Sequence, residues 1–170
     1  KSMKINTKGQ VKLGKVNTKK VDIKLFKKNI LLYYTNIFRP SEKVLMSQKK
    51  NISKSKLVQD HMYKIQKIGY ESYEAIINNN FDEFGKLLDE HYNLKRKTSN
   101  LMSSNSLDKI YRYSKNVGSI GGKIVGAGGG GIFMFYVPYK KQKIFRKSMH
   151  KTGIKEISWN IDNFGVKRIF

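Results

Sequence analysis

The chain has 170 residues, of which 39% are hydrophobic and 12% aromatic, enough for one globular domain with a buried core. No apolar run approaches the ~20 residues that span a bilayer, so a membrane protein is not expected. The chain has no cysteine, which excludes disulfides and thiolate metal sites and suits a cytoplasmic protein. The three histidines are scattered without metal-ligand spacing, so no metal site is predicted.

The formal charge of +23 comes from 35 Lys and Arg residues against 12 Asp and Glu residues. These basic residues are spread along the whole chain, and the aromatic residues lie inside apolar runs rather than between lysines. The sequence has no RNA-recognition or zinc-finger signature. We therefore predict a solvated basic surface that attracts nucleic acid only non-specifically and in a salt-sensitive way.

The first 39 residues carry strand signals. Residues 1–29 alternate weakly in polarity, and Lys8-Gly9 and Leu13-Gly14 are turn signals, which indicates short strands or a sheet edge. The β-branched and aromatic run "NILLYYTNIF" follows and ends at Arg39-Pro40. This run predicts a buried strand.

Residues 41–117 have helical periodicity, with three apolar stripes. Asn80 is a candidate N-cap for the second stripe, with Glu83 three residues later, and Ser106 is a candidate N-cap for the third, which Gly118 would end. The first stripe comprises Val58, Met62, Ile65, Ile68, Tyr73 and Ile76, the second Phe81, Phe84, Leu88 and His91, and the third Leu107, Ile110 and Tyr111.

The last region returns to strand character. "IFMFYV" predicts a buried strand, "YKKQKIFRKSMHKTG" a helix with Ile144 and Met149 on its apolar face and Gly153 as its end, and "IKEISWNI" a half-buried strand. "DNFG" would then turn the chain into a final strand, "VKRIF". The order of elements predicts an α+β fold, with helices packed on one face of a largely antiparallel sheet.

The segment "GGKIVGAGGGG" holds seven glycines in eleven residues and precedes the apolar strand. Gly126, Gly128 and Gly131 satisfy G-x-G-x-x-G, but a dinucleotide fold requires a helix after the loop. A Walker A loop fails as well, because Val117 and Ile124 stand at two of its required positions. Consecutive glycines can present several backbone N–H groups to an anion such as phosphate. The alternative is a tight turn or bulge where elements crowd together.

These residues resemble the GHMP kinases, the superfamily of galactokinase, homoserine kinase and mevalonate kinase, whose third signature motif is similar to "GGKIVGAGGGG" and the strand after it. Within the superfamily the resemblance is strongest to the D-glycero-D-manno-heptose 7-phosphate kinases. It extends to "LLYYTNIFR" at 31–39, to "FGKLLDE" at 84–90 and to the closing "IDNFG". Asn36 replaces the usual glycine of the first segment, although asparagine tolerates a left-handed backbone.

The resemblance implies that residues 30–170 form a GHMP kinase C-terminal domain, with a ferredoxin-like α+β fold. It also implies that residues 1–29 are the tail of a preceding N-terminal kinase domain missing from this chain. That domain would bind most of the ATP and Mg²⁺ and carry the catalytic acidic residue, because nothing in residues 1–120 resembles the family's "P-x-x-x-G-L-G-S-S" loop. The expected activity is ATP-dependent phosphorylation of a sugar or sugar phosphate, with this chain inactive alone.

The resemblance and the residue types together give candidate site residues. The glycine loop would face the phosphates and the missing half of the cleft rather than this chain's own core, with N–H groups at 128–130 as fixed dipoles. Lys123, Arg39 and Arg96 are candidates for binding the substrate; Lys123 could instead be a solvated lysine and Arg39 a helix-end arginine. The competing hypothesis is a non-enzymatic basic module that binds a polyanion. The predicted loop comprises Gly126, Ala127, Gly128, Gly129, Gly130 and Gly131.

Overall fold

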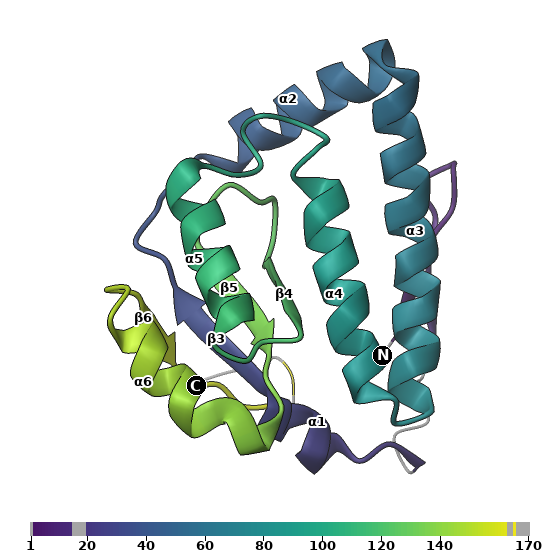
Figure 1. The fold of residues 1–170 in the computed structure, drawn as a ribbon. Helices are drawn as coiled ribbons and strands as arrows, with labels where there is room; N and C mark the ends of the chain where they lie inside the picture. Colours follow the sequence, from purple (N-terminus) through teal and green to yellow (C-terminus); the bar gives the residue numbers. More distant parts are fainter. Residues whose placement is uncertain (1, 15–19, 163–164, 166–170) are drawn as a thin grey trace, which may run out of the picture.

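The computed structural model describes residues 2–14, 20–162 and 165. Strands lie at both ends of this region, and four helices fill its middle (Figure 1). In chain order the elements are β1 (Ser2–Ile5), β2 (Val11–Gly14), α1 (Ile23–Asn29), β3 (Ile30–Tyr34), α2 (Ser41–Lys54), α3 (Lys56–Ile77), α4 (Phe81–Lys95), α5 (Asn105–Asn116), β4 (Gly121–Ile124), β5 (Ile132–Tyr136), the 3₁₀ turn η2 (Tyr139–Lys141), α6 (Gln142–His150) and β6 (Lys155–Ile157).

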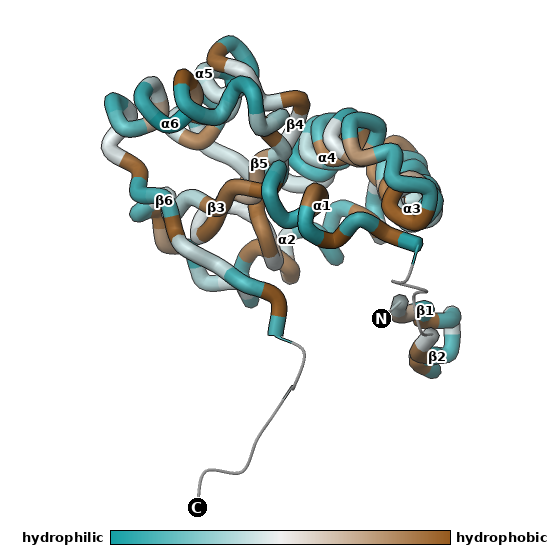
Figure 2. Tube along the Cα trace, turned by 90° about the horizontal axis from the view of Figure 1, so that it is seen from below, coloured by the Kyte–Doolittle hydropathy of each residue, from teal (hydrophilic) through white to brown (hydrophobic). Residues whose placement is uncertain are grey.

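The main sheet has four strands in the order β4-β5-β3-β6, and each neighbouring pair is antiparallel. Helices α5 and α6 cover one side of it, while α4 lies along β4 with α3 outside it (Figure 2). Strands β1 and β2 form a separate antiparallel hairpin beside α3. The structure confirms the predicted α+β class, with helices packed on an antiparallel sheet.

The first core cluster lies between the sheet and helices α5 and α6. Alternate residues of β3 and β5 point into it, as the period-2 geometry of strands requires. Phe133 and Phe135 are fully buried there, with ring centroids 4.9 Å apart. The buried members are Leu31, Tyr33, Tyr92, Leu107, Tyr111, Ile124, Phe133, Phe135, Val137, Phe145, Met149 and Ile154.

The second core cluster joins α3 and α4 to α1 and to the remaining side chains of β3 and β5. Phe26 of α1 contacts the rings of Phe81 and Phe84, each with centroids 5.4 Å away. The predicted boundary between two domains after residue 29 stays a prediction. The contact of Phe26 with α4 nevertheless places α1 with the helices that follow. The buried members are Val21, Ile30, Ile68, Ala75, Phe81, Phe84, Leu87, Leu88, Leu94 and Tyr136.

Several local predictions need correction. Tyr73 of the first stripe is 37% exposed and Ile144 of α6 is 67% exposed, so neither lies on the buried face of its helix. The buried residues of α6 are Gln142, Phe145 and Met149. The N-cap of α5 is Ser104, whose hydroxyl accepts the Leu107 N–H, and not Ser106. Helix α1 was not predicted, and the strand expected over 154–161 is confined to β6. The predicted final strand at 166–170 lies outside the described residues.

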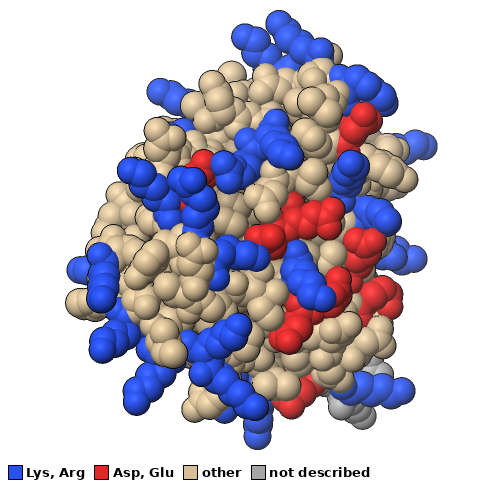
Figure 3. Space-filling model, in the orientation of Figure 1, with Lys and Arg blue, Asp and Glu red and all other residues tan. Residues whose placement is uncertain are grey.

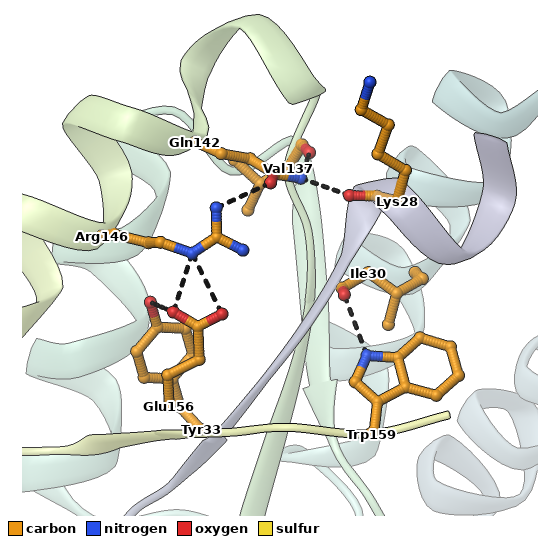
Figure 4. Close-up of polar contacts among 8 residues, drawn as sticks. All are labelled: Lys28, Ile30, Tyr33, Val137, Gln142, Arg146, Glu156 and Trp159. Carbon is orange, nitrogen blue, oxygen red and sulfur yellow. Dashed lines mark hydrogen bonds and ion pairs between the residues drawn. The ribbon is translucent and has the colours of Figure 1, made fainter. Parts of the chain in front are cut away.

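A polar network anchors α6 and β6 to β3 (Figure 4). The buried Gln142 amide donates to the carbonyls of Lys28 (2.5 Å) and Val137 (3.0 Å), and its oxygen accepts from Arg146. Arg146 Nε lies 2.9 and 3.0 Å from the two carboxylate oxygens of Glu156. The Trp159 indole donates to Ile30 O at 3.1 Å. The network therefore ties the C-terminal elements to the start of β3.

We expect Gln142→Leu to lower the free energy of unfolding by about 1–3 kcal/mol, because two carbonyls lose their buried donor. Urea denaturation of both proteins measures the change. Gln59→Leu is the matched control, since Gln59 donates to a carbonyl from an exposed position. Equal stability of the two variants would show that the network contributes nothing beyond packing.

Charge on the face of the molecule seen in Figure 3 is unevenly distributed. Lys and Arg side chains are scattered over the whole face, whereas Asp and Glu gather over α3 and α4. The scattered arrangement agrees with the even spread of lysines along the sequence. Among the described residues, no helix combines the length and the apolar character that a bilayer crossing requires.

Candidate functional site

The glycine loop, residues 126–131, connects β4 to β5. Gly126, Gly128, Gly129 and Gly131 have φ values of 94°, 103°, 77° and 85°. Side chains rarely adopt this left-handed region, because Cβ approaches the backbone too closely there. The backbone conformation thus accounts for glycine at these four positions before any ligand is considered.

The loop also lies very close to this chain's own backbone. A Cβ atom at Gly129 would be 2.4 Å from the Leu101 carbonyl oxygen, and one at Gly130 would be 2.3 Å from that of Ile37. By contrast, a Cβ atom at Gly126 would meet no atom within 4 Å. The prediction that the whole loop faces away from this chain was therefore wrong, because its centre packs between the segment after β3 and the segment after α4.

Hydrogen bonds fix this position. Gly129 donates its N–H to Met102 O (3.0 Å), and Gly131 donates to Ile37 O (2.9 Å). Gly131 O in turn accepts from both the backbone N–H and the hydroxyl of Thr35, each at 2.9 Å. Asn36 between these contacts has a φ of 56°, which confirms the left-handed backbone predicted for it.

Bonded and unbonded N–H groups consequently alternate over residues 128–131 of the loop. Gly129 is not an available phosphate donor, which corrects the prediction for 128–130. Within the part of the chain that the structure describes, the N–H groups of Gly128 and Gly130 donate to no acceptor. These two N–H groups are therefore available to water or to a ligand.

A cleft of about 480 Å³ opens on one side of the loop. The N-terminus of α2 also borders it, and its N-cap residue, Pro40, offers no side-chain acceptor to the first turn. Arg39 lies in this cleft and donates through Nη1 to Leu101 O at 3.2 Å. The described lining residues are Tyr34, Ile37, Phe38, Arg39, Pro40, Ser41, Glu42, Val125, Ala127, Gly128, Gly130 and Gly131.

A smaller hollow lies between the loop, β4 and the end of α4, and it brings together basic side chains. Lys123 Nζ lies 3.2 Å from His91 Nε2, and Lys95 Nζ donates to the Gln48 side-chain oxygen at 3.1 Å. Burial and the charges of Lys123 and Lys95 lower the pKa of His91 to about 4. The His91 ring is therefore neutral at pH 7.

Arg96 borders the same hollow but is already paired. Its Nη2 lies 2.7 Å from Asp108 Oδ2, and Ser103 donates to the other carboxylate oxygen at 2.5 Å. Burial raises the pKa of the neighbouring Tyr92 hydroxyl to about 12. Of the predicted substrate candidates, Lys123 and Arg96 thus share the smaller hollow, whereas Arg39 lies in the larger cleft.

His91 was missing from the predicted site. The resemblance to the GHMP kinases groups Lys95 with Arg96 as a basic helix end, and the structure places Lys95 beside His91. They lie four residues apart on α4, which places both side chains on one face of the helix. Their proximity to Lys123 depends on how α4 packs against β4. The i, i+4 spacing of a histidine and a lysine was the signal in the sequence, but on its own it identifies no partner.

The described residues give no fit for a divalent cation, because no three Asp, Glu or His side chains among them gather closely enough to hold one. Glu42 is the sole carboxylate among the described residues that line the larger cleft. No step of the chemistry is therefore assigned to a metal held by this chain.

Comparison with known proteins relates this geometry to a family of kinases. Residues 72–155 match the family model described as "GHMP kinases C terminal". The chain carries a GHMP kinase C-terminal domain. The matched region includes α4, α5, β4, the glycine loop and β5, and so contains both sides of the smaller hollow.

Individual relatives agree with the family. The chain is 30% identical over 143 residues to a D-glycero-alpha-D-manno-heptose 7-phosphate kinase of Campylobacter jejuni, with 77% of this chain and 41% of that protein covered. The fold is similar to that of L. major mevalonate kinase in complex with R-mevalonate, with a TM-score of 0.65 and 20% identity. The match covers 72% of this chain and 37% of that chain. The fold is also similar to that of a D-glycero-D-manno-heptose 1-phosphate kinase from "Bacteriodes thetaiotaomicron" (TM-score 0.58, 16% identity, 91% and 40%). The chain thus spans about two fifths of these relatives.

Proposed function

We propose that this chain is the C-terminal part of an ATP-dependent kinase that phosphorylates a sugar or sugar phosphate. The observation that carries the proposal is the alternation in the glycine loop, where Gly129 and Gly131 are bonded internally while Gly128 and Gly130 keep free N–H groups beside the larger cleft. Such an arrangement suits an anion, because fixed N–H dipoles in a concavity attract negative charge.

Phosphoryl transfer requires positioning and neutralisation of the charge on the transferred group. Gly128 and Gly130 can supply two preorganised dipoles that need no rearrangement during the reaction. The uncapped first turn of α2 adds the positive end of a helix dipole, and Arg39 adds a guanidinium suited to phosphate oxygens. We assign the nucleotide phosphates and the accepting hydroxyl to this cleft.

The remaining machinery is assigned to a preceding domain. We propose that this N-terminal kinase domain binds most of the ATP and Mg²⁺ and supplies the catalytic acidic residue. Residues 1–29 would be its tail, with α1 at the end of that tail packed on the helices described here. The β1–β2 hairpin supports this assignment, because Met3, Ile5, Val11 and Leu13 are all more than half exposed. Apolar side chains gathered on a short hairpin favour contact with another domain.

The Campylobacter relative suggests the first substrate to test. This relative is a heptose 7-phosphate kinase, so we propose this sugar phosphate as acceptor, with the anomeric hydroxyl as the group phosphorylated. We expect residues 1–170 alone to show no turnover, and a polypeptide that joins them to the N-terminal domain to convert ATP and heptose 7-phosphate into ADP and a bisphosphate. Turnover by residues 1–170 alone would contradict the division of labour.

Ala127 offers a sharp test of the loop's role, because it lines the cleft and has no positive φ. In the joined polypeptide we expect Ala127→Asp to lower kcat/KM by about 100-fold, since a carboxylate would repel the triphosphate. Ala127→Asn has nearly the same shape without the charge and should lose much less. Steady-state kinetics, with melting temperatures as a check on folding, make the comparison. Equal losses in the two variants would attribute the effect to bulk and contradict an anion at this site.

A further inference from the structure

The smaller hollow gathers two lysines and a histidine without a counter-charge. Within the described residues, Lys95 and Lys123 form no ion pair with a carboxylate, and their polar contacts are the neutral groups of Gln48 and His91. Asp108, the carboxylate that contacts Arg96 at the border of the hollow, is paired with that guanidinium. The arrangement differs from that of Lys56, Lys67 and Lys86, which all pair with an acid on their own helix.

The surroundings make this unpaired charge unfavourable. Both lysines are half-buried, and burial lowers the pKa of each. The charge of Lys95 lowers the pKa of Lys123 further, so the two ammonium groups repel each other. Burying charge is costly unless an opposite charge accompanies it. An anion between the lysines would remove both the repulsion and part of the desolvation cost.

The size of the hollow limits what can enter. Its volume is about 10 Å³, which is space for one small group, and its wall includes Met102, Gly126 and Gly128. A terminal phosphate oxygen can enter, whereas a sugar ring cannot. Gly128 lines both this hollow and the larger cleft, so the two spaces adjoin at the glycine loop.

We propose that Lys95 and Lys123 bind the phosphate monoester that the substrate already carries before the reaction, with neutral His91 accepting a hydrogen bond from Lys123 and so orienting it. The accepting hydroxyl of the same substrate lies across Gly128 in the larger cleft. The substrate is therefore a sugar phosphate whose phosphate and accepting hydroxyl lie at opposite ends. This assignment rests on the proposed function and adds a second phosphate position, distinct from that of the transferred group.

The test measures binding of inorganic phosphate to the 170-residue chain, without ATP, by calorimetry at constant ionic strength. We expect saturable binding that Lys123→Met and Lys95→Met each weaken about tenfold or more, as the loss of a charge-assisted hydrogen bond predicts. Lys64→Met, on an exposed part of α3, removes the same charge and should leave binding unchanged. The melting temperature of Lys123→Met should be no lower than that of the unmodified chain, because an unpaired buried charge is removed.

A second readout reports on the hollow itself. Phosphate should raise the pKa of the His91 imidazole from about 4, since an anion beside it favours the protonated ring, and NMR titration of its ring protons detects this. Equal weakening in all three lysine variants, no saturation up to tens of millimolar phosphate, or an unchanged His91 pKa would each overturn the proposal. The phosphate titration contains no ATP, so its outcome is independent of the kinase assay. A negative phosphate titration does not contradict the proposed kinase activity, and a negative kinase assay does not contradict phosphate binding in the hollow.

Discussion

Gly129→Ala is expected to lower the free energy of unfolding by about 3 kcal/mol or more, which combines left-handed strain of about 1–2 kcal/mol with a steric clash of similar size. The clash arises because the new Cβ atom would be 2.4 Å from Leu101 O and 3.2 Å from Arg39 Cδ. Movement to relieve it would also break the Gly129 N–H bond to Met102 O. For a chain of this size the melting temperature should fall by about 10 °C.

Gly126→Ala is the matched control within the same loop. Its φ of 94° brings the strain, but no atom lies within 4 Å of the added Cβ, so the loss should be about 1–2 kcal/mol. Thermal unfolding of both variants in the 170-residue chain gives the difference directly. Equal losses would mean that the close approach to Leu101 does not occur. Because Gly129 serves folding, its replacement cannot by itself report on catalysis, whereas Ala127 can.

Gly121→Ala is expected to be comparably damaging for a different reason. Helix α4 lies so close to β4 that a Cβ atom at Gly121 would be 2.0 Å from Gly85 O and 2.8 Å from the Asp89 nitrogen. Both contacts are helix backbone, so α4 must move away from the strand, at a cost of about 3 kcal/mol. This movement separates His91 and Lys95 from Lys123, and we expect phosphate binding to be lost together with stability.

Gly69→Ala provides the opposite control for that variant. Gly69 lies in the interior of α3 with no atom within 4 Å of an added Cβ, so alanine should stabilise the chain by about 0.5–1 kcal/mol. Urea denaturation of both variants, with calorimetric phosphate titration of the folded proteins, tests the pair. A Gly121→Ala protein with unchanged stability and phosphate affinity would show that the packing of α4 on β4 does not position the hollow.

Much of the fold could be predicted from the sequence, because the periodicity of apolar side chains indicates which residues of a helix or strand are buried. The continuous apolar run "IFMFYV" predicted β5 as a buried strand, and Phe133 and Phe135 in it are fully buried. The spacing of Phe81, Phe84 and Leu88 likewise predicted the buried face of α4. Helix α1 was missed because its seven residues are too few to show a clear period, and packing of Phe26 on Phe81 and Phe84 supports it from outside.

The site was only partly predictable, because its residues show no periodic pattern of apolar side chains. Glycines have no side chain whose polarity could reveal which way they face. The approach of Gly129 to Leu101 therefore could not be predicted from the sequence. The contact of Lys123 with His91 joins residues 32 positions apart and depends on the tertiary packing of α4 on β4. The density of the glycines did predict a loop of special conformation, as the positive φ values of four of them agree.

We propose that the glycine loop offers the N–H groups of Gly128 and Gly130 to phosphate, while those of Gly129 and Gly131 hold the loop in place. Titration of the ¹⁵N-labelled chain with tripolyphosphate, followed by amide chemical shifts, tests this residue by residue. We predict the largest shifts at Gly128 and Gly130 and much smaller ones at Gly129 and Gly131, whose N–H groups are bonded to Met102 and Ile37. Shifts spread over the lysine-rich helices with none in the loop, or shifts as large at Gly129 as at Gly128, would contradict the account.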